Sequence, residues 1–150
     1  MNSLVIAKAQ AQRAHDLGLV CYRPTVDVAF DPSKPLVCFG ELPAEPILAV
    51  AVNVYDVAAE LDDDRIQVDN PLVRIQWRFR APGDDAGQAV HNHAHAFFKA
   101  MHTDTPGSWP GGVAPIWCLR TVTAPAELDN GHWSKADSYE IRCNQGDYTP

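Results

Sequence analysis

The sequence predicts an α+β fold, in which two helices pack on one face of a mostly antiparallel sheet of four to six strands. Apolar residues recur at helical spacing near the start of the chain and again after residue 84. Several short runs elsewhere alternate apolar and polar residues, as half-buried strands do. These runs follow one another through mostly short connections, which favours antiparallel pairing. We therefore expect the order helix, four strands, helix, two strands.

The length and composition predict one folded domain. The chain has 150 residues, of which 46% are hydrophobic and 21% charged, so it can build a core and is not a charge-rich disordered chain. We expect a single domain over residues 1–150, with a loose C-terminal tail from about residue 144. The first residues are interrupted by Lys8 and Gln10, and no apolar run is long enough to span a bilayer, so we expect neither a signal peptide nor a membrane segment.

The net charge of -7 and the pI near 5.2 argue against tight sequence-specific binding of nucleic acid. A locally basic surface that DNA merely passes remains compatible with this composition. The four cysteines include no CxxC pair, so they give no zinc-finger or redox signal. We expect reduced thiols that act as small core residues.

The first helix is expected over residues 3–17, because Asn2 or Ser3 can cap its start and Gly18 can end it. The proline-rich stretch that follows favours two short edge strands, at residues 25–30 and 36–39. Residues 47–54 are apolar enough for a central strand. An acidic stretch comes next, with Glu60, Asp62, Asp63 and Asp64, and we interpret it as a solvated loop.

Residues 72–80 form the strongest predicted strand, because apolar and polar side chains alternate without interruption. One face is expected to be core and the other polar and positive. The expected core side chains of this strand are Val73, Ile75, Trp77 and Phe79, and those of the opposite face are Arg74, Gln76, Arg78 and Arg80.

A second helix is expected from Asp84 or Asp85, either of which can cap it, to about His102. Its apolar stripe includes Phe97, which we expect in the core. Two final strands are expected at residues 114–122 and 138–143, the second with Ile141 in the core. Asn130-Gly131 predicts a turn between them, but the connection looks too long for a tight hairpin.

The arginines are the most suggestive group on the predicted sheet. Three lie on one strand face, and two more are expected on the polar side of the last two strands. The five are Arg74, Arg78, Arg80, Arg120 and Arg142. This pattern is open to three interpretations: a solvated face with local salt bridges, an interface with an acidic partner, or a wall that DNA passes.

The histidines give a weaker signal. His91 and His95 share a helix face with the spacing of two zinc ligands, and His102 falls near the same line. Asn92 stands where a zinc hydrolase of the HExxH type has glutamate. No third ligand is obvious, and Asp104 is only a guess. We expect no metal site, no cofactor and no catalytic residue. A small metal-binding hydrolase that uses His91 and His95 is the alternative.

The arrangement of these segments resembles the tail terminator and minor capsid family of long-tailed phages. The resemblance is carried by Leu17-Gly18-Leu19-Val20, by Phe39-Gly40-Glu41-Leu42-Pro43, by the strand at 72–80, by the helix at 86–102, by a closing strand with Arg120 and by the final strand at 139–144. In this family a strand similar to VQIRVRG leads into the second helix. Here the glycine is absent and Ala81-Pro82-Gly83 takes its place.

The resemblance implies a structural virion protein rather than an enzyme. Such subunits form a homo-hexameric ring at the head-proximal end of the tail tube, stop tube polymerisation and offer a surface to the head. The implied partners are the major tail tube protein, the head-completion protein that acts as stopper or connector, and phage DNA in the lumen, with no membrane. The ring would be assembled in the host cytoplasm. Another head–tail completion protein, or a monomeric binding module, remains an alternative.

Overall fold

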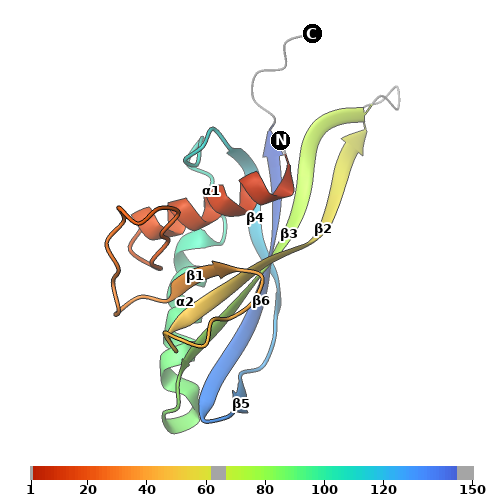
Figure 1. The fold of residues 1–150 in the computed structure, drawn as a ribbon. Coiled ribbons are helices and arrows are strands. Elements are labelled where there is room, and N and C mark those ends of the chain that lie inside the picture. Colours follow the sequence, from red (N-terminus) through yellow and green to blue (C-terminus); the bar gives the residue numbers. More distant parts are fainter. Residues whose placement is uncertain (1, 62–66, 145–150) are drawn as a thin grey trace.

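The computed structural model describes residues 2–61 and 67–144. Side chains are described for all of these residues except 56–61 and 67–69. The elements follow the order of Figure 1. They are α1 (Ser3–Asp16), β1 (Leu36–Phe39), β2 (Ala49–Leu61), β3 (Gln67–Pro82), the short 3-10 turn η1 (Asp85–Gly87), α2 (Gln88–Met101), β4 (Ala114–Thr123), β5 (Glu127–Asp129) and β6 (His132–Asn144). The predicted α+β class is confirmed. None of the helices in this described part is long or apolar enough to cross a lipid bilayer.

The six strands form one mixed sheet, in which five follow the order β1-β2-β3-β6-β4. The sixth strand, β5, pairs with the first residues of β6, and β4 pairs with the later ones. All neighbours are antiparallel except β1 and β2, which are parallel. β2 and β3 form a long hairpin that extends beyond the body of the molecule (Figure 1). The prediction of a largely antiparallel sheet is therefore confirmed, and β3 lies at its centre.

Both helices pack on the same face of the sheet, because their buried side chains belong to one hydrophobic cluster with those of β2, β3 and β6. Phe97 of α2 lies at the middle of this cluster. Its ring centroid is 4.3 Å from that of Trp77, 5.5 Å from Phe79 and 5.2 Å from Tyr139. The six core residues expected from the sequence are at most 1% exposed: Val73, Ile75, Trp77, Phe79, Phe97 and Ile141. That prediction is confirmed.

A buried polar contact joins α1 to the sheet. Gln10 lies on the inner side of α1 and is fully buried. Its Oε1 accepts a hydrogen bond of 2.8 Å from Trp77 Nε1, and its Nε2 donates to Cys118 Sγ at 3.6 Å. The small residues around it, Ala7, Ala11 and Ala14, are also fully buried, so α1 approaches the sheet closely. Because α1 shields the indole N–H of Trp77 from water, Gln10 provides the hydrogen-bond acceptor that this buried donor needs.

The expected strand at residues 25–30 is absent from the structure, which has turns and bends there. Arg23 Nε donates to Val28 O at 2.7 Å and closes a local turn, and Pro24 and Pro32 restrict pairing on either side. Three strands rather than four therefore separate the helices.

Two predictions concern residues outside the described part of the chain. They are the solvated loop, as far as it includes Asp62, Asp63 and Asp64, and the C-terminal tail beyond Asn144.

A tight hairpin joins β5 to β6, contrary to the expectation of a long connection. Asp129 pairs with His132, which leaves Asn130 and Gly131 as a two-residue turn. Both have positive φ, of 50° and 79°, as a type I′ turn requires. The alternation in the sequence predicts the start of the last strand at residue 138, whereas β6 begins six residues earlier, at His132. Three strands therefore follow α2.

Replacing Trp77 with Ala should lower the free energy of unfolding by about 3–5 kcal/mol, because the core loses a large ring and Gln10 loses its donor. Urea unfolding followed by circular dichroism measures this. Gln76→Ala, on the opposite face of the same strand, is the matched control and should change stability by no more than about 0.5 kcal/mol. Equal effects of the two substitutions would mean that the faces of β3 are reversed.

Thiol accessibility gives a second test of the core. Burial raises the pKa of Cys143 to about 12 and raises the pKa of Cys118 further, so neither forms the reactive thiolate at neutral pH. Cys38 is only half-buried, although burial raises its pKa as well. At about pH 8, iodoacetamide should label Cys38 first and the other thiols only after unfolding. Mass spectrometry of native Cys38→Ser that finds rapid labelling of Cys118 or Cys143 would contradict this packing.

Candidate interaction surface

The face of the sheet away from the helices carries the arginine row predicted from the sequence. Arg74, Arg78 and Arg80 alternate with the buried residues of β3, and the register places them beside Glu140, Ala136 and Ser134 of β6. All three are partly exposed. The structure therefore brings three of the five expected arginines onto one strand face, and their individual partners decide what each can do.

Arg74 and Arg142 belong to a network that spans three strands. Arg74 Nη2 lies 3.1 Å from Glu140 Oε1, and the other oxygen of Glu140 accepts a 3.1 Å hydrogen bond from Trp117 Nε1. Arg142 Nη1 donates to Asn70 O at 2.7 Å, and its guanidinium carbon lies 5.4 Å from the Trp117 ring centroid. The two arginines therefore fix β3, β6 and β4 to one another on this face.

Arg80 has a different structural role, because its guanidinium binds main-chain carbonyls. It donates to Ile47 O at 3.0 Å and to Pro46 O at 3.1 Å, and it also donates to Pro43 O. These carbonyls belong to the connection between β1 and β2. A single partly buried guanidinium thus pairs with three carbonyl groups of a proline-rich segment, whose prolines have no N–H of their own to donate.

Arg120 lies on the other face of the sheet, and its predicted position with the other arginines is wrong. Its guanidinium carbon is 3.7 Å from the Phe98 ring centroid of α2, and its Nη1 is 3.7 Å from Asp137 Oδ2. Asp137 is fully buried and also accepts from Lys135 Nζ at 2.7 Å. Two register shifts in β4, at 115–117 and 120–122, hide the alternation that would have shown this in the sequence.

Arg78 differs from its neighbours. Its side chain has no hydrogen bond or ion pair with the part of the chain that the structure describes. It borders a hollow of about 230 Å³ at the end of the sheet where β5 turns into β6. The hollow is lined by Leu42, Arg78, Arg80, Asp129, Asn130, His132 and Ser134. His132 Nδ1 is buried there without a hydrogen-bond partner among the described atoms.

The predicted histidine face is not assembled into a site. His91 and His95 are exposed, whereas His102 Nδ1 accepts a 3.0 Å hydrogen bond from the Arg120 backbone N–H. Asp104, the suggested third ligand, accepts hydrogen bonds from Arg13 and from Trp109 Nε1, the latter at 2.9 Å. In residues 2–61 and 67–144, no cluster of three or more His, Cys, Asp or Glu side chains has a geometry that could hold a metal ion.

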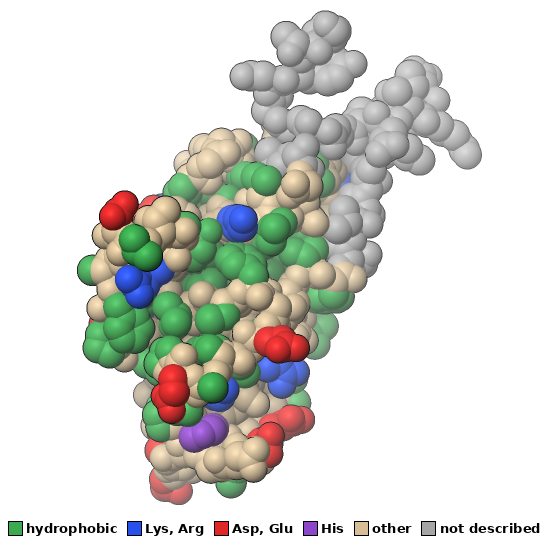
Figure 2. All heavy atoms as spheres, viewed as in Figure 1, with side chains coloured by type: hydrophobic (Ala, Val, Ile, Leu, Met, Phe, Trp, Pro, Cys, Tyr) green, Lys and Arg blue, Asp and Glu red, His purple; other side chains and the backbone are tan. Residues whose placement is uncertain are grey.

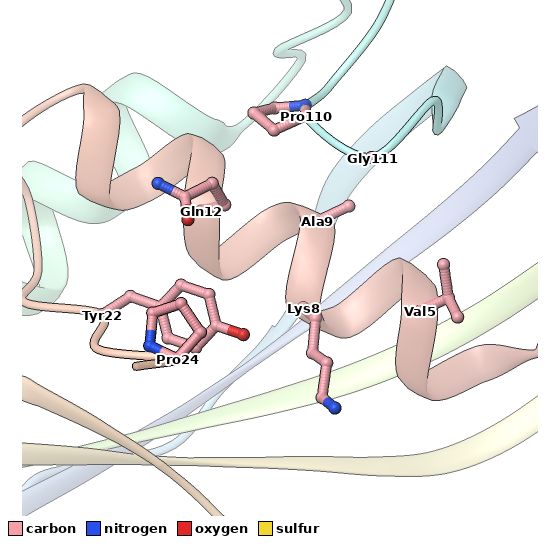
Figure 3. A pocket seen from close by; sticks show the side chains of 8 residues that line it. All are labelled: Val5, Lys8, Ala9, Gln12, Tyr22, Pro24, Pro110 and Gly111. Carbon is pink, nitrogen blue, oxygen red and sulfur yellow. The ribbon is translucent and has the colours of Figure 1, made fainter. Parts of the chain in front are cut away.

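A second hollow, of about 370 Å³, lies along α1 and was not foreseen from the sequence. Figure 3 shows Pro110 and Gly111 on one side of the helix and Tyr22 with Pro24 on the other. Its walls combine residues between 5 and 24 with Pro110 and Gly111, which lie far away in the sequence, so no local pattern could have indicated it. Figure 2 shows hydrophobic side chains spread over this view of the molecule, with the coloured Lys and Arg side chains isolated from one another.

Comparison with known proteins shows the fold and nothing finer. No protein-family model matches the sequence, and no curated protein matches it. One solved structure, of a protein whose name describes no function, is similar over the full length. The match covers 100% of this chain and 99% of the other, with a TM-score of 0.61 and 15% sequence identity. At that identity the similarity extends to the architecture alone.

The two adjacent arginines of β3 should respond differently to removal. Arg80→Ala should lower the free energy of unfolding by about 1.5–3 kcal/mol, because three carbonyls lose a charged donor. Arg78→Ala should change it by no more than about 0.5 kcal/mol. Urea midpoints of the two variants measure the difference. A destabilisation of similar size in both would show that Arg78 is a structural residue too.

Proposed function

We propose that this chain is a structural virion protein, a tail terminator subunit of a long-tailed phage. It would form a homo-hexameric ring at the head-proximal end of the tail tube, stop tube polymerisation and join the tail to the head. The proposal rests on the resemblance of the sequence to that family. The structural observation that supports it best is that the two edges of the sheet expose different groups of large apolar side chains.

The first edge is formed by β4 and β5, which both pair with β6 and leave their outer sides without a strand in the described part of the chain. Ile116 and Val122 of β4 are 47% and 57% exposed, and Leu128 of β5 is 60% exposed. Residues 102 and 103 cover the middle of β4, because Thr103 N donates to Cys118 O at 2.6 Å and His102 Nδ1 accepts from Arg120 N at 3.0 Å. The exposed apolar side chains lie on either side of this stretch, and such side chains at a strand edge favour contact with another chain. The register shifts within β4 make that edge irregular, which restricts pairing to a partner of matching shape.

The second edge is β1 and the segment that precedes it. Cys21 bridges to Leu36 on the outer side of β1, so this edge is covered by the chain itself rather than left open. The following loop presents Val26, which is 89% exposed, and Phe30, which is 44% exposed. The two exposed apolar side chains here belong to a loop, whereas those of the β4–β5 edge belong to strands.

Two unlike apolar edges support a ring, because a closed ring of identical subunits is built from heterologous contacts in which one patch meets a different patch of the next subunit. The open sheet face agrees with a role next to DNA. Most of its arginines are already paired within the chain, and the chain has a net charge of -7. Such a face would hold phosphates weakly, as a channel that DNA must pass requires.

A charge placed on the β4–β5 edge should disturb assembly without unfolding the subunit. Val122→Asp leaves the core intact, because the side chain is exposed, but it would put a carboxylate into the proposed contact. Phage made with this variant should have tails of irregular length or heads without tails, as seen by electron microscopy. Ala96→Asp, on the exposed side of α2, adds the same charge elsewhere and should leave tails normal.

Normal tails of uniform length in the Val122→Asp phage, together with a folded variant protein, would remove the proposed edge contact. Absence of the chain from purified particles, judged by mass spectrometry, would remove the tail assignment itself. The two results are separable, since the first concerns the contact and the second the location.

A further inference from the structure

We propose that the hollow at Arg78 is a carboxylate-binding site, and that its occupant is the acidic stretch at residues 60–64 of a second copy of this chain. This inference names a contact between subunits of the proposed ring. It rests on the proposed function only in assigning that contact to a ring. The contact itself can be measured with the isolated protein.

Arg78 is the arginine whose charge is unused within the described residues. Each of the other six arginines with a described side chain has a partner there. Arg13 binds Asp104, Arg23 binds Val28 O, Arg74 binds Glu140, Arg80 binds the carbonyls of residues 43–47, Arg120 binds Asp137, and Arg142 binds Asn70 O. A guanidinium with free donors beside a concave surface is suited to a planar carboxylate, which it can bind through two parallel hydrogen bonds.

The remaining walls of the hollow favour a protein carboxylate over a nucleic-acid backbone. Ser134 and Asn130 add neutral polar groups, and Leu42 adds an apolar one. Asp129 offsets one of the two arginine charges, so the hollow has a small positive charge rather than a strong one. DNA binding normally depends on several free cations along a surface, whereas here the arginines beside Arg78 are already paired.

The densest group of carboxylates falls in the sequence at the end of β2 and in the residues that precede β3. Residues 60–64 read Glu-Leu-Asp-Asp-Asp, four acids in five positions. Leu61 and Gln67, on either side of positions 62–66, pair with each other, and five residues between two paired positions are too few to extend to the hollow of the same chain. The 11 residue-to-residue steps of β3 from Gln67 to Arg78 span about 36 Å at the usual strand rise, and β2 pairs with β3 along this length.

Leu61 and Gln67, which flank positions 62–66, lie at one end of the β2–β3 hairpin, and the β5–β6 turn, whose residues line the hollow, lies at the other end of the sheet (Figure 1). Complementary charges at opposite ends cannot meet in a contact within one chain, but they meet when copies are arranged head to tail. A head-to-tail contact is heterologous, and its repetition closes a ring or continues as a filament. The long hairpin would then reach across to the neighbouring subunit.

A charge exchange between two variants tests this contact. In the first variant, Arg78→Glu, both the hollow and the acidic stretch are negative. In the second, the hollow is unchanged and the stretch becomes positive through three substitutions: Asp62→Lys, Asp63→Lys and Asp64→Lys. Each should self-associate at least about tenfold more weakly than the unchanged protein, in sedimentation velocity at low ionic strength. An equimolar mixture should recover association, because each acidic stretch then finds a basic hollow and each basic stretch an acidic one.

A synthetic peptide of residues 58–68 tests the hollow directly, even where the free protein is monomeric. It should bind the unchanged protein and Lys99→Glu, which makes the same charge change on the exposed side of α2. It should bind Arg78→Glu at least about tenfold more weakly. Circular dichroism of each variant confirms folding before binding is measured.

The inference is overturned if the peptide binds Arg78→Glu as well as it binds the unchanged protein, or binds neither. It is also overturned if the mixture stays dissociated while the unchanged protein associates, or if duplex DNA occupies the hollow in preference to the peptide. These assays measure the contact alone. A chain that fails them but still yields phage whose tail length depends on Val122 would retain the proposed function without this contact.

Discussion

β3 lies between β2 and β6, so each of its side chains between residues 72 and 80 must go to one face of the sheet or the other. This constraint determines most of the remaining structure. A shift of one residue would put Arg74, Arg78 and Arg80 under the helices and Trp77 in water. The buried row then selects what can cover it, which is the small-residue side of α1 and the Phe97 side of α2. The arginines of β3 lie on the opposite face, which no helix covers in the described part of the chain. Their guanidinium groups can pair there with other side chains, with main-chain carbonyls or with another molecule.

The two rows have different consequences for function. The buried row ends in a specific polar contact, since Trp77 donates to Gln10 and so fixes how α1 sits on the sheet. The arginine row is mostly a structural device: Arg74 and Arg142 join strands, and Arg80 holds the connection at residues 43–47. A positive sheet face therefore need not mean a DNA-binding surface. Among the arginines with described side chains, Arg78 has no partner within the described residues, and the proposed contact between subunits is placed there for that reason.

The fold was largely predictable because its main signals are local. The alternation at 72–80, the capped helix starting at residue 3 and the apolar stripe with Phe97 each follow from neighbouring residues in the sequence. The failures came where distant segments decide. The side of Arg120 depends on bulges in β4 and on Phe98 of α2, and the tight turn at Asn130 could be recognised only by extending β6 back to His132. The role of Arg80 depends on carbonyls more than thirty residues away, and neither hollow has a local signature.

Cryo-electron microscopy of purified phage particles made with this chain tests the central claim most directly. The account predicts a closed ring of six copies at the head-proximal end of the tail tube. In that ring, the β4–β5 edge of each subunit would face a different surface of its neighbour. Particles with complete tails that lack the chain, or that hold it at another position or in a contact between identical surfaces, would contradict the account.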